Sequence, residues 1–442
     1  MLRPATLSGV ARSAFVIGFI TILVRLFSFG REVAAAAVFG VGADLDVFLI
    51  AYLAPSFLFF AILACAGPAI IPALMNARQH SGEQGLRAII ANANGAALIG
   101  FCGLGLLCAV ASPLYLPLLV THLTPEKMAL AQLWLLLLCL LVPLFGFAAL
   151  WTAIANAHGS LALPACVPVL SPIVTIIMLF TYAQDHGAWA FVNGTLLGAV
   201  LEFGVMGILL FRRGLLVAPR LKFSPDSGFE RAFATLFAGA AIMGLIPATG
   251  QAMAASIGTG SITGFIFAGR LVSLTGSMGA LALGAAVLPA FARLAAAADW
   301  GALRQLVRRC VLLTLALALP LCAGISWFSL PIAEIMFQRG QFSSDDATMV
   351  AGVQSYLILQ IPFYLGWIVL ARVLATLGRN NVLLLLSSGA AVLNLCLNYL
   401  STQAYGATGI AAATAITFFL LFAVTYAAAY FLLPSPPPEQ KL

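Results

Sequence analysis

Residues 128–155 read MALAQLWLLLLCLLVPLFGFAALWTAIA and contain no charged side chain. A membrane core of about 30 Å is crossed by about 20 predominantly apolar residues in a helix, so this stretch is long enough to span it. Similar runs recur from Phe15 to Leu433 with short polar gaps between them. The sequence therefore predicts an all-α integral membrane protein.

The composition leads to the same class. Hydrophobic residues make up 62% of the chain and charged residues only 8%, whereas a soluble domain carries about 25% charged residues. Such a sequence cannot cover a water-exposed surface, so lipid must be the solvent. The formal net charge of +7 needs no nucleic-acid partner, because Lys and Arg in cytoplasmic loops face anionic lipid headgroups.

The apolar runs predict about twelve transmembrane helices. They are expected near 14–39, 45–74, 88–111, 128–155, 161–182, 188–211, 232–256, 262–291, 305–330, 348–376, 381–401 and 407–433. Arg25 and Arg31 interrupt the first run, and no small-x-small cleavage site follows it. We therefore expect a retained first helix rather than a signal peptide.

The loop charges predict the topology. With a cytoplasmic amino terminus, most Lys and Arg fall in inside segments, and the outside loops hold only Lys127 and Arg339. This asymmetry follows the positive-inside rule. Both termini are then expected to be cytoplasmic.

A faint internal repeat predicts two domains. The stretch GPAIIPA at 67–73 resembles GAAVLPA at 284–290, about half the chain further on. Duplication of this kind predicts two parallel six-helix bundles around a central cavity. The bundles would be residues 1–211 and 232–433, joined by a cytoplasmic linker, 212–231, and followed by a cytoplasmic tail, 434–442.

Four arginines, Arg25, Arg31, Arg270 and Arg372, fall inside predicted spans. A central arginine facing lipid costs about 2.5 kcal/mol or more, so such residues usually face a polar cavity or a partner. The structural alternatives are an ion pair of Arg25 or Arg31 with Glu32, and snorkelling of Arg372 to the interface.

A surplus of buried guanidinium groups indicates an anionic substrate. The planar guanidinium fork binds phosphate through two parallel hydrogen bonds and keeps its charge. Ser273 and Ser277 follow Arg270 at helical spacing and extend a polar stripe. We therefore expect Arg25, Arg31, Arg270, Ser273 and Ser277 to contact a phosphate-bearing substrate.

Two further acids are candidates: Asp46 opens the second predicted span, and Glu202 lies inside the sixth. Asp46 is a helix cap, a loop charge or a cavity acid, and Glu202 either pairs with a neighbouring helix or acts as a proton site. The eight cysteines show no ligand spacing, so no metal site is expected. No phosphate-binding G-x-x-x-x-G-K-[ST] motif and no cofactor motif occurs.

Several stretches together resemble the MviN/MurJ family of lipid II flippases, within the multidrug, oligosaccharidyl-lipid and polysaccharide exporter superfamily. They are RLFSFGRE at 25–32, FGVG at 39–42, DVF at 46–48, the prolines Pro164 and Pro168, GRL at 269–271 and FQRGQF at 337–342. They occur in the family's order and at matching spacing.

The resemblance implies a flippase, not an enzyme, that moves an undecaprenyl-diphosphate-linked saccharide such as lipid II for peptidoglycan synthesis by alternating access. Arg25, Arg31 and Arg270 would hold the diphosphate, with Asp46 as an acidic partner. The protein would lie in the bacterial inner membrane, with membrane lipid and cell-envelope synthesis proteins as partners. The family's cation site is partly matched by Asn394, Asn398 and Thr414.

The sequence also departs from the family pattern. Pro55-Ser56 and Phe59-Phe60 stand where the family's second helix carries arginines, and Gly269 and Ser273 replace acids on the eighth. The alternatives are therefore a flippase for an exopolysaccharide or O-antigen precursor, and a non-transporting membrane scaffold that kept the fold. A multidrug exporter is disfavoured because the buried charge is expected to be net positive.

Overall fold

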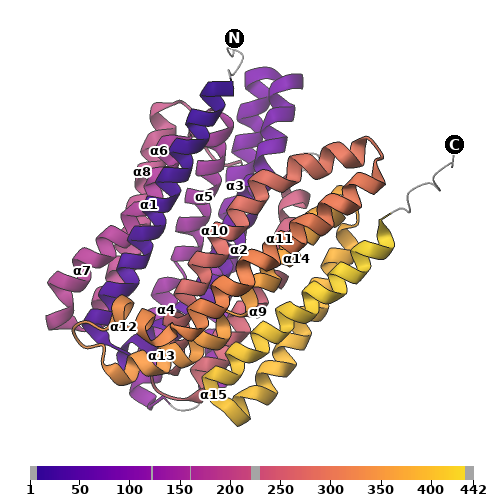
Figure 1. Ribbon diagram of the computed structural model, residues 1–442. Coiled ribbons are helices and arrows are strands. Elements are labelled where there is room, and N and C mark those ends of the chain that lie inside the picture. Colours follow the sequence, from indigo (N-terminus) through magenta and orange to yellow (C-terminus); the bar gives the residue numbers. More distant parts are fainter. Residues whose placement is uncertain (1–6, 121–122, 160, 221–228, 434–442) are drawn as a thin grey trace. The chain divides into compact units, whose positions relative to one another are not determined.

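The computed structural model describes residues 7–120, 123–159, 161–220 and 229–433, and side chains for all of these except 7–15, 17, 281, 282 and 284–289. Within these ranges the regular secondary structure is helical throughout, without strands (Figure 1). The predicted all-α class is confirmed. The predicted tail, 434–442, lies outside the described residues, as do the side chains of the repeat at 284–289.

The chain forms two compact units. Unit 1 comprises Met1–Gly244 with Arg339–Gln341, and unit 2 comprises Leu245–Gln338 with Phe342–Leu442. The predicted division at 212–231 stays a prediction, because 221–228 are not described.

Unit 1 contains eight α-helices, a short 3-10 helix and the start of α9, as far as the structure describes it. These elements are α1 (Leu7–Phe39), α2 (Ala43–His80), α3 (Gly82–Leu119), α4 (Pro125–Leu138), α5 (Leu141–Ala157), α6 (Ala162–Cys166), η1 (Val167–Val169), α7 (Leu170–His186), α8 (Trp189–Arg212) and α9 (Phe229–Ile257).

Unit 2 contains the rest of α9 and the remaining helices. These are α10 (Ser261–Ala296), α11 (Trp300–Trp327), α12 (Ser329–Phe337), α13 (Ser344–Leu357), α14 (Gln360–Thr376) and α15 (Asn380–Leu432).

The described residues include 9 helical segments long and apolar enough to cross a membrane. The chain is thus a multi-pass membrane protein, while the count of twelve stays a prediction. One of the nine, α15, has 53 residues and an interruption at Gly406, where φ is 58°. A straight helix of that length would measure about 80 Å, far more than one bilayer core. Gly406 falls in the gap that the sequence predicts between its last two spans.

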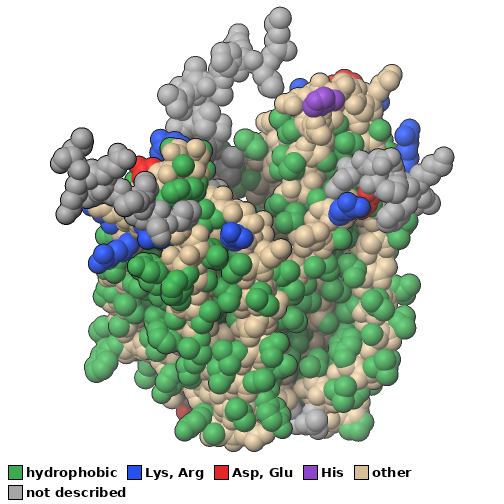
Figure 2. All heavy atoms as spheres, turned by 90° about the vertical axis from the view of Figure 1, so that its right-hand side faces the viewer, with side chains coloured by type: hydrophobic (Ala, Val, Ile, Leu, Met, Phe, Trp, Pro, Cys, Tyr) green, Lys and Arg blue, Asp and Glu red, His purple; other side chains and the backbone are tan. Residues whose placement is uncertain are grey.

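Helix α3 exposes an apolar face. Leu106, Val110, Leu114 and Leu118 recur at every fourth position and are 65–81% exposed. The opposite face of the helix, including Phe101, is buried. Figure 2 shows hydrophobic side chains over most of one face, with Lys and Arg toward its upper end. An exposed leucine stripe of this kind faces lipid.

The core of unit 1 is built from several helices. Its buried members include Ile62, Ile70, Ile90, Leu150, Ile154, Met206 and Leu210. The segment 214–220, which follows α8, lies across α3: the Asn94 side-chain amide donates to the Val217 carbonyl at 2.8 Å, and the Arg220 N–H donates to the Ala91 carbonyl at 2.9 Å. Gly95 of α3 leaves room for Arg220, whose backbone occupies the space of a Cβ.

Two hydrophobic cores are described within unit 2. The larger is formed by side chains of α10, α11, α14 and the end of α15, among them Phe291, Leu303, Val369, Leu370 and Leu374. A smaller one joins α9, α14 and α15 around Ile246, Ala390 and Phe418.

Candidate functional site

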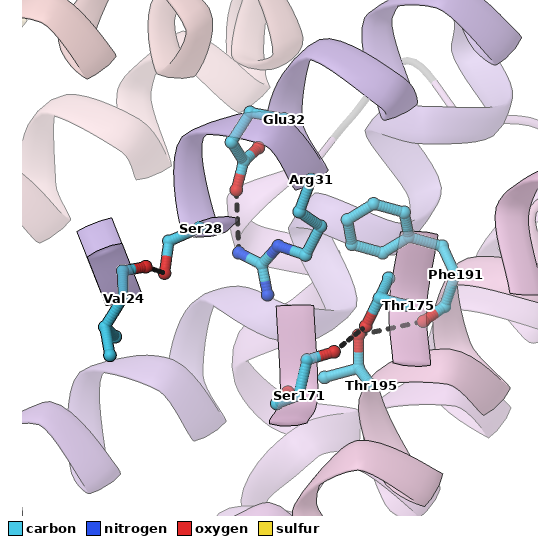
Figure 3. Close-up of polar contacts among 8 residues, drawn as sticks. All are labelled: Val24, Ser28, Arg31, Glu32, Ser171, Thr175, Phe191 and Thr195. Carbon is cyan, nitrogen blue, oxygen red and sulfur yellow. Dashed lines mark hydrogen bonds and ion pairs between the residues drawn. The ribbon is translucent and has the colours of Figure 1, made fainter. Parts of the chain in front are cut away.

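Arg31 is the centre of a buried polar group in unit 1. Its Nη2 lies 2.7 Å from Glu32 Oε1, and the two side chains are 16% and 5% exposed. The Arg31 Cζ lies 5.6 Å from the centroid of the Phe191 ring on α8. Figure 3 shows the guanidinium between Glu32 and the side chains of α7 and α8. Arg31 therefore ties α1 to the rest of unit 1.

Two further side chains interact electrostatically with Arg31. They are Tyr52 of α2 and Glu202 of α8. Gly30 of α1 lies against α7, since a Cβ added there would be in ordinary contact with the Ile176 side chain at 3.8 Å. Arg31 thus interacts electrostatically with Glu32, Tyr52 and Glu202 within unit 1.

Glu202 is only 5% exposed. Its Oε1 accepts a hydrogen bond from the Ser171 backbone N–H at 3.2 Å. Ser171 lies in the first turn of α7, where backbone N–H groups have no partner within the helix. The carboxylate therefore caps a helix that starts inside unit 1, after the 3-10 turn at Val167–Val169.

Asp46 is 1% exposed and lies in the first turn of α2. It is therefore a buried acid of unit 1 and not a solvated loop charge. A carboxylate in the first turn is stabilised by the helix dipole. Asp46, Glu32 and Glu202 are the three buried acidic residues among the described side chains of unit 1.

Arg25 differs from Arg31. It lies on α1 among exposed side chains and is itself exposed. On the same helix Ser28 donates its hydroxyl to the Val24 carbonyl at 2.8 Å (Figure 3). Within unit 1 as described, Arg25 therefore lies at the surface, whereas Arg31 is paired with Glu32. The net charge of the buried groups stays a prediction.

The residues of unit 2 expected to contact the substrate lie on α10. Arg270 is partly buried, Ser273 is exposed, and the Ser277 hydroxyl donates to the Leu274 carbonyl at 3.0 Å. Gly269, beside Arg270, faces Leu357 of α13, with 3.7 Å from an added Cβ to the leucine side chain. The substrate candidates thus divide between the units: Arg25, Arg31 and Asp46 belong to unit 1 and the other three to unit 2.

A buried polar cluster joins α9 to both parts of α15. Asn398 Nδ2 donates to Asn394 Oδ1 at 2.9 Å, and Thr249 donates to the same oxygen at 3.1 Å. Asn394 Nδ2 donates to the Thr417 hydroxyl at 3.2 Å. Thr414 is 5% exposed and bonds to the Ile410 carbonyl at 2.9 Å.

This cluster is built from amides and hydroxyls. Glu202, the fourth cation or proton candidate, belongs to unit 1 and Asn394, Asn398 and Thr414 to unit 2. The described residues contain no group of three or more His, Cys, Asp or Glu side chains that could hold a metal ion. A bound cation in this cluster would have to rely on neutral oxygen ligands.

Sequence reasoning did not single out Tyr52, Phe191, Ser171, Thr249 or Thr417. Tyr52 and Phe191 look like ordinary apolar helix residues. Ser171 contributes its backbone rather than its side chain. The one sequence feature that could have pointed to Ser171 is the group of prolines at 164, 168 and 172. Prolines interrupt the hydrogen bonding of a helix, so backbone N–H groups near them can lack a partner within the helix.

Comparisons with known proteins agree along most of the chain. The family described as lipid II flippase MurJ matches residues 35–432. A probable lipid II flippase MurJ of Synechocystis sp. is 27% identical, over 92% of this chain and 79% of that protein. One of Vibrio cholerae is 26% identical, over 96% of this chain and 84% of that protein.

Solved structures share the fold. A lipid II flippase MurJ in an inward closed conformation has a TM-score of 0.80 at 20% identity, covering 94% of this chain and 87% of that one. An inward-facing multidrug resistance MATE family transporter of the MOP superfamily has a TM-score of 0.75 at 16% identity, covering 95% and 98%. With the family match over most of its length, the chain belongs to the lipid II flippase MurJ family, a family of transporters.

Proposed function

We propose that this protein flips lipid II, or a closely related undecaprenyl-diphosphate-linked saccharide, across the bacterial inner membrane by alternating access. Membership of the MurJ family carries the proposal. The multi-pass helical fold and the two compact units support it. The loop charges favour cytoplasmic amino and carboxyl termini.

In this proposal the arginines have different roles. Of the two arginines proposed on α1, Arg25 is the exposed one, so we assign the diphosphate contact to it. Arg31 is held by Glu32 at 2.7 Å, so it fixes the position of α1. It attracts the diphosphate through its positive charge rather than by direct contact. Arg270, with the exposed Ser273, is the corresponding group of unit 2.

Transport then follows from the two units. The inward-open state admits the diphosphate to the arginines while the lipid tail stays in the bilayer. Relative movement of the units next opens the site to the outside, as in two-bundle transporters. The membrane potential, an ion gradient or consumption of the product outside would supply the energy, with Glu202 or the cluster of Asn394, Asn398 and Thr414 as candidate coupling sites.

Reconstitution into liposomes with fluorescent lipid II tests the proposal. We expect Arg25→Ala and Arg270→Ala each to lower the flipping rate by about tenfold or more, because each removes a charge-assisted phosphate contact. Arg372→Ala is the matched control: it removes an exposed arginine of α14 that the sequence assigns to the interface. Equal rates for all three variants and the parent would contradict the arginine assignment.

The substrate is tested separately. Complementation of a strain depleted of its lipid II flippase is expected to restore growth. The departures at Pro55-Ser56 and Gly269 keep the exopolysaccharide or O-antigen alternative open. Failure to complement, together with flipping of such a saccharide in liposomes, would favour it, and failure with every saccharide would favour the scaffold.

A further inference from the structure

A cavity of about 300 Å³ opens at one end of unit 1. It is lined by Glu83 and Arg87 at the start of α3, His158 at the end of α5, and Arg213 with the residues that follow α8. The loop charges predict that this end is cytoplasmic. None of the residues proposed to bind the transported headgroup lines it.

The walls of this cavity are held in place. Leu215 and Val217 line it and also pack against the core of unit 1. The Val217 carbonyl accepts from the Asn94 side chain at 2.8 Å, and Asn94 in turn accepts from Trp151 Nε1 at 3.2 Å. The Leu215 N–H donates to the Leu210 carbonyl at 2.9 Å. The lining after α8 is thus a fixed part of the unit.

The lining carries a surplus of positive charge. The lining contains the exposed arginines Arg87 and Arg213, and Glu83 is its single carboxylate. Neither Arg87 nor Arg213 forms an ion pair with another residue in the part of the chain that the structure describes. Two guanidinium groups without ion pairs are suited to an oxyanion.

His158 provides a third polar group. Its Nδ1 lies 2.9 Å from the Ile154 carbonyl oxygen, so Nδ1 carries the proton that makes this contact attractive. The Nε2 atom is buried and has no hydrogen-bond partner among the described groups. A buried polar atom normally has a partner. With the proton on Nδ1, Nε2 can accept a hydrogen bond from a ligand hydroxyl, such as that of a singly protonated phosphate.

We propose that this cavity binds a phosphate group between Arg87 and Arg213, with His158 Nε2 as the third contact. The phosphate belongs either to an anionic lipid headgroup of the inner leaflet or to a soluble phosphate ester. The site is separate from the transported substrate, so the inference does not depend on the proposed function.

Binding to the purified full-length protein tests the proposal. Calorimetry in a neutral maltoside detergent measures the affinity for inorganic phosphate and for glycerol 1-phosphate. Native mass spectrometry measures retention of phosphatidylglycerol from phosphatidylcholine nanodiscs that contain it. We expect Arg87→Gln and Arg213→Gln to weaken binding by about tenfold each, since each loses a charge-assisted hydrogen bond.

Arg212→Gln is the matched control. It removes the same charge one residue away, from an exposed arginine that does not line the cavity, and is expected to bind as the parent does. His158→Phe keeps a ring and removes Nε2, so its binding should also weaken.

Each outcome has a definite meaning. The site is supported if Arg87→Gln and Arg213→Gln weaken binding and Arg212→Gln does not. Whether they weaken binding of the soluble phosphates, of the lipid or of both identifies the source of the phosphate. Absence of binding with every probe would overturn the proposal. So would equal weakening in Arg212→Gln, which would mean that diffuse surface charge attracts the anion.

Discussion

At the scale of single residues, the charged side chains of unit 1 differ in burial. Arg31, Glu32, Asp46 and Glu202 are largely withdrawn from the surface, whereas Arg25 is exposed. Breaking a buried ion pair leaves an uncompensated charge, which is strongly destabilising. The two arginines of the RLFSFGRE stretch should therefore respond differently to substitution.

We expect Arg31→Gln to lower the free energy of unfolding by about 3 kcal/mol, because Glu32 stays buried without its ion pair. Arg25→Gln should change it little. Thermal unfolding in detergent measures both. The double variant Arg31→Gln with Glu32→Gln should recover part of the loss, and equal destabilisation by the Arg25 and Arg31 changes would refute this assignment.

Glu202 gives a second residue-scale prediction. Glu202→Ala should lower stability by about 1–3 kcal/mol, because the Ser171 N–H loses its acceptor inside the unit. Glu202→Gln keeps an acceptor oxygen and should unfold near the parent's temperature. If Glu202 also carries a transported proton, the glutamine variant will be stable yet lose transport driven by a pH gradient.

At the scale of helices, α8 packs closely on α7 through a face of small residues. Gly194, Gly198 and Glu202 lie four residues apart along α8. A Cβ at Gly198 would lie 2.6 Å from the Ser171 Cα, and one at Gly194 would lie 2.9 Å from the Thr175 Cα. Small residues allow membrane helices this approach, and it brings the Glu202 carboxylate to the first turn of α7.

Gly198→Ala should therefore separate α7 from α8 and lower stability by about 1–3 kcal/mol. Gly204→Ala is the control on the same helix, because a Cβ there meets nothing within 4 Å. It should be neutral or stabilising, as alanine favours helices over glycine by about 1 kcal/mol. Unfolding temperatures compare the two, and equal losses would show that the close packing is unimportant.

At the scale of the whole molecule, the charge pattern predicts a topology that labelling can test. Asp345 and Gln84 are both exposed, and they are predicted to lie outside and inside respectively. A membrane-impermeant maleimide should label Asp345→Cys in intact spheroplasts but Gln84→Cys only after lysis. The parent, whose eight cysteines are free, gives the background. The reverse pattern would invert the proposed orientation.

The sequence predicts the helices better than the contacts. Each predicted span overlaps a helix because an apolar run of that length must satisfy its own backbone in lipid, and the break at Gly406 falls where the polar gap predicts it. The exposure of Arg25 and the contact of Arg31 with Phe191 were not predictable. Both depend on how α1 rotates against α7 and α8, which the spacing along one helix does not determine.

The exposed stripe of α3 also acts as a measure of bilayer thickness. Its large apolar side chains run from Ile99 to Leu118, which at about 1.5 Å per residue is a length of about 28 Å. This length matches acyl chains of ordinary bacterial membranes. In vesicles with much shorter or longer chains the helix would have to tilt or the bilayer deform, so the choice of lipid chain length will itself influence the conformational balance of the protein.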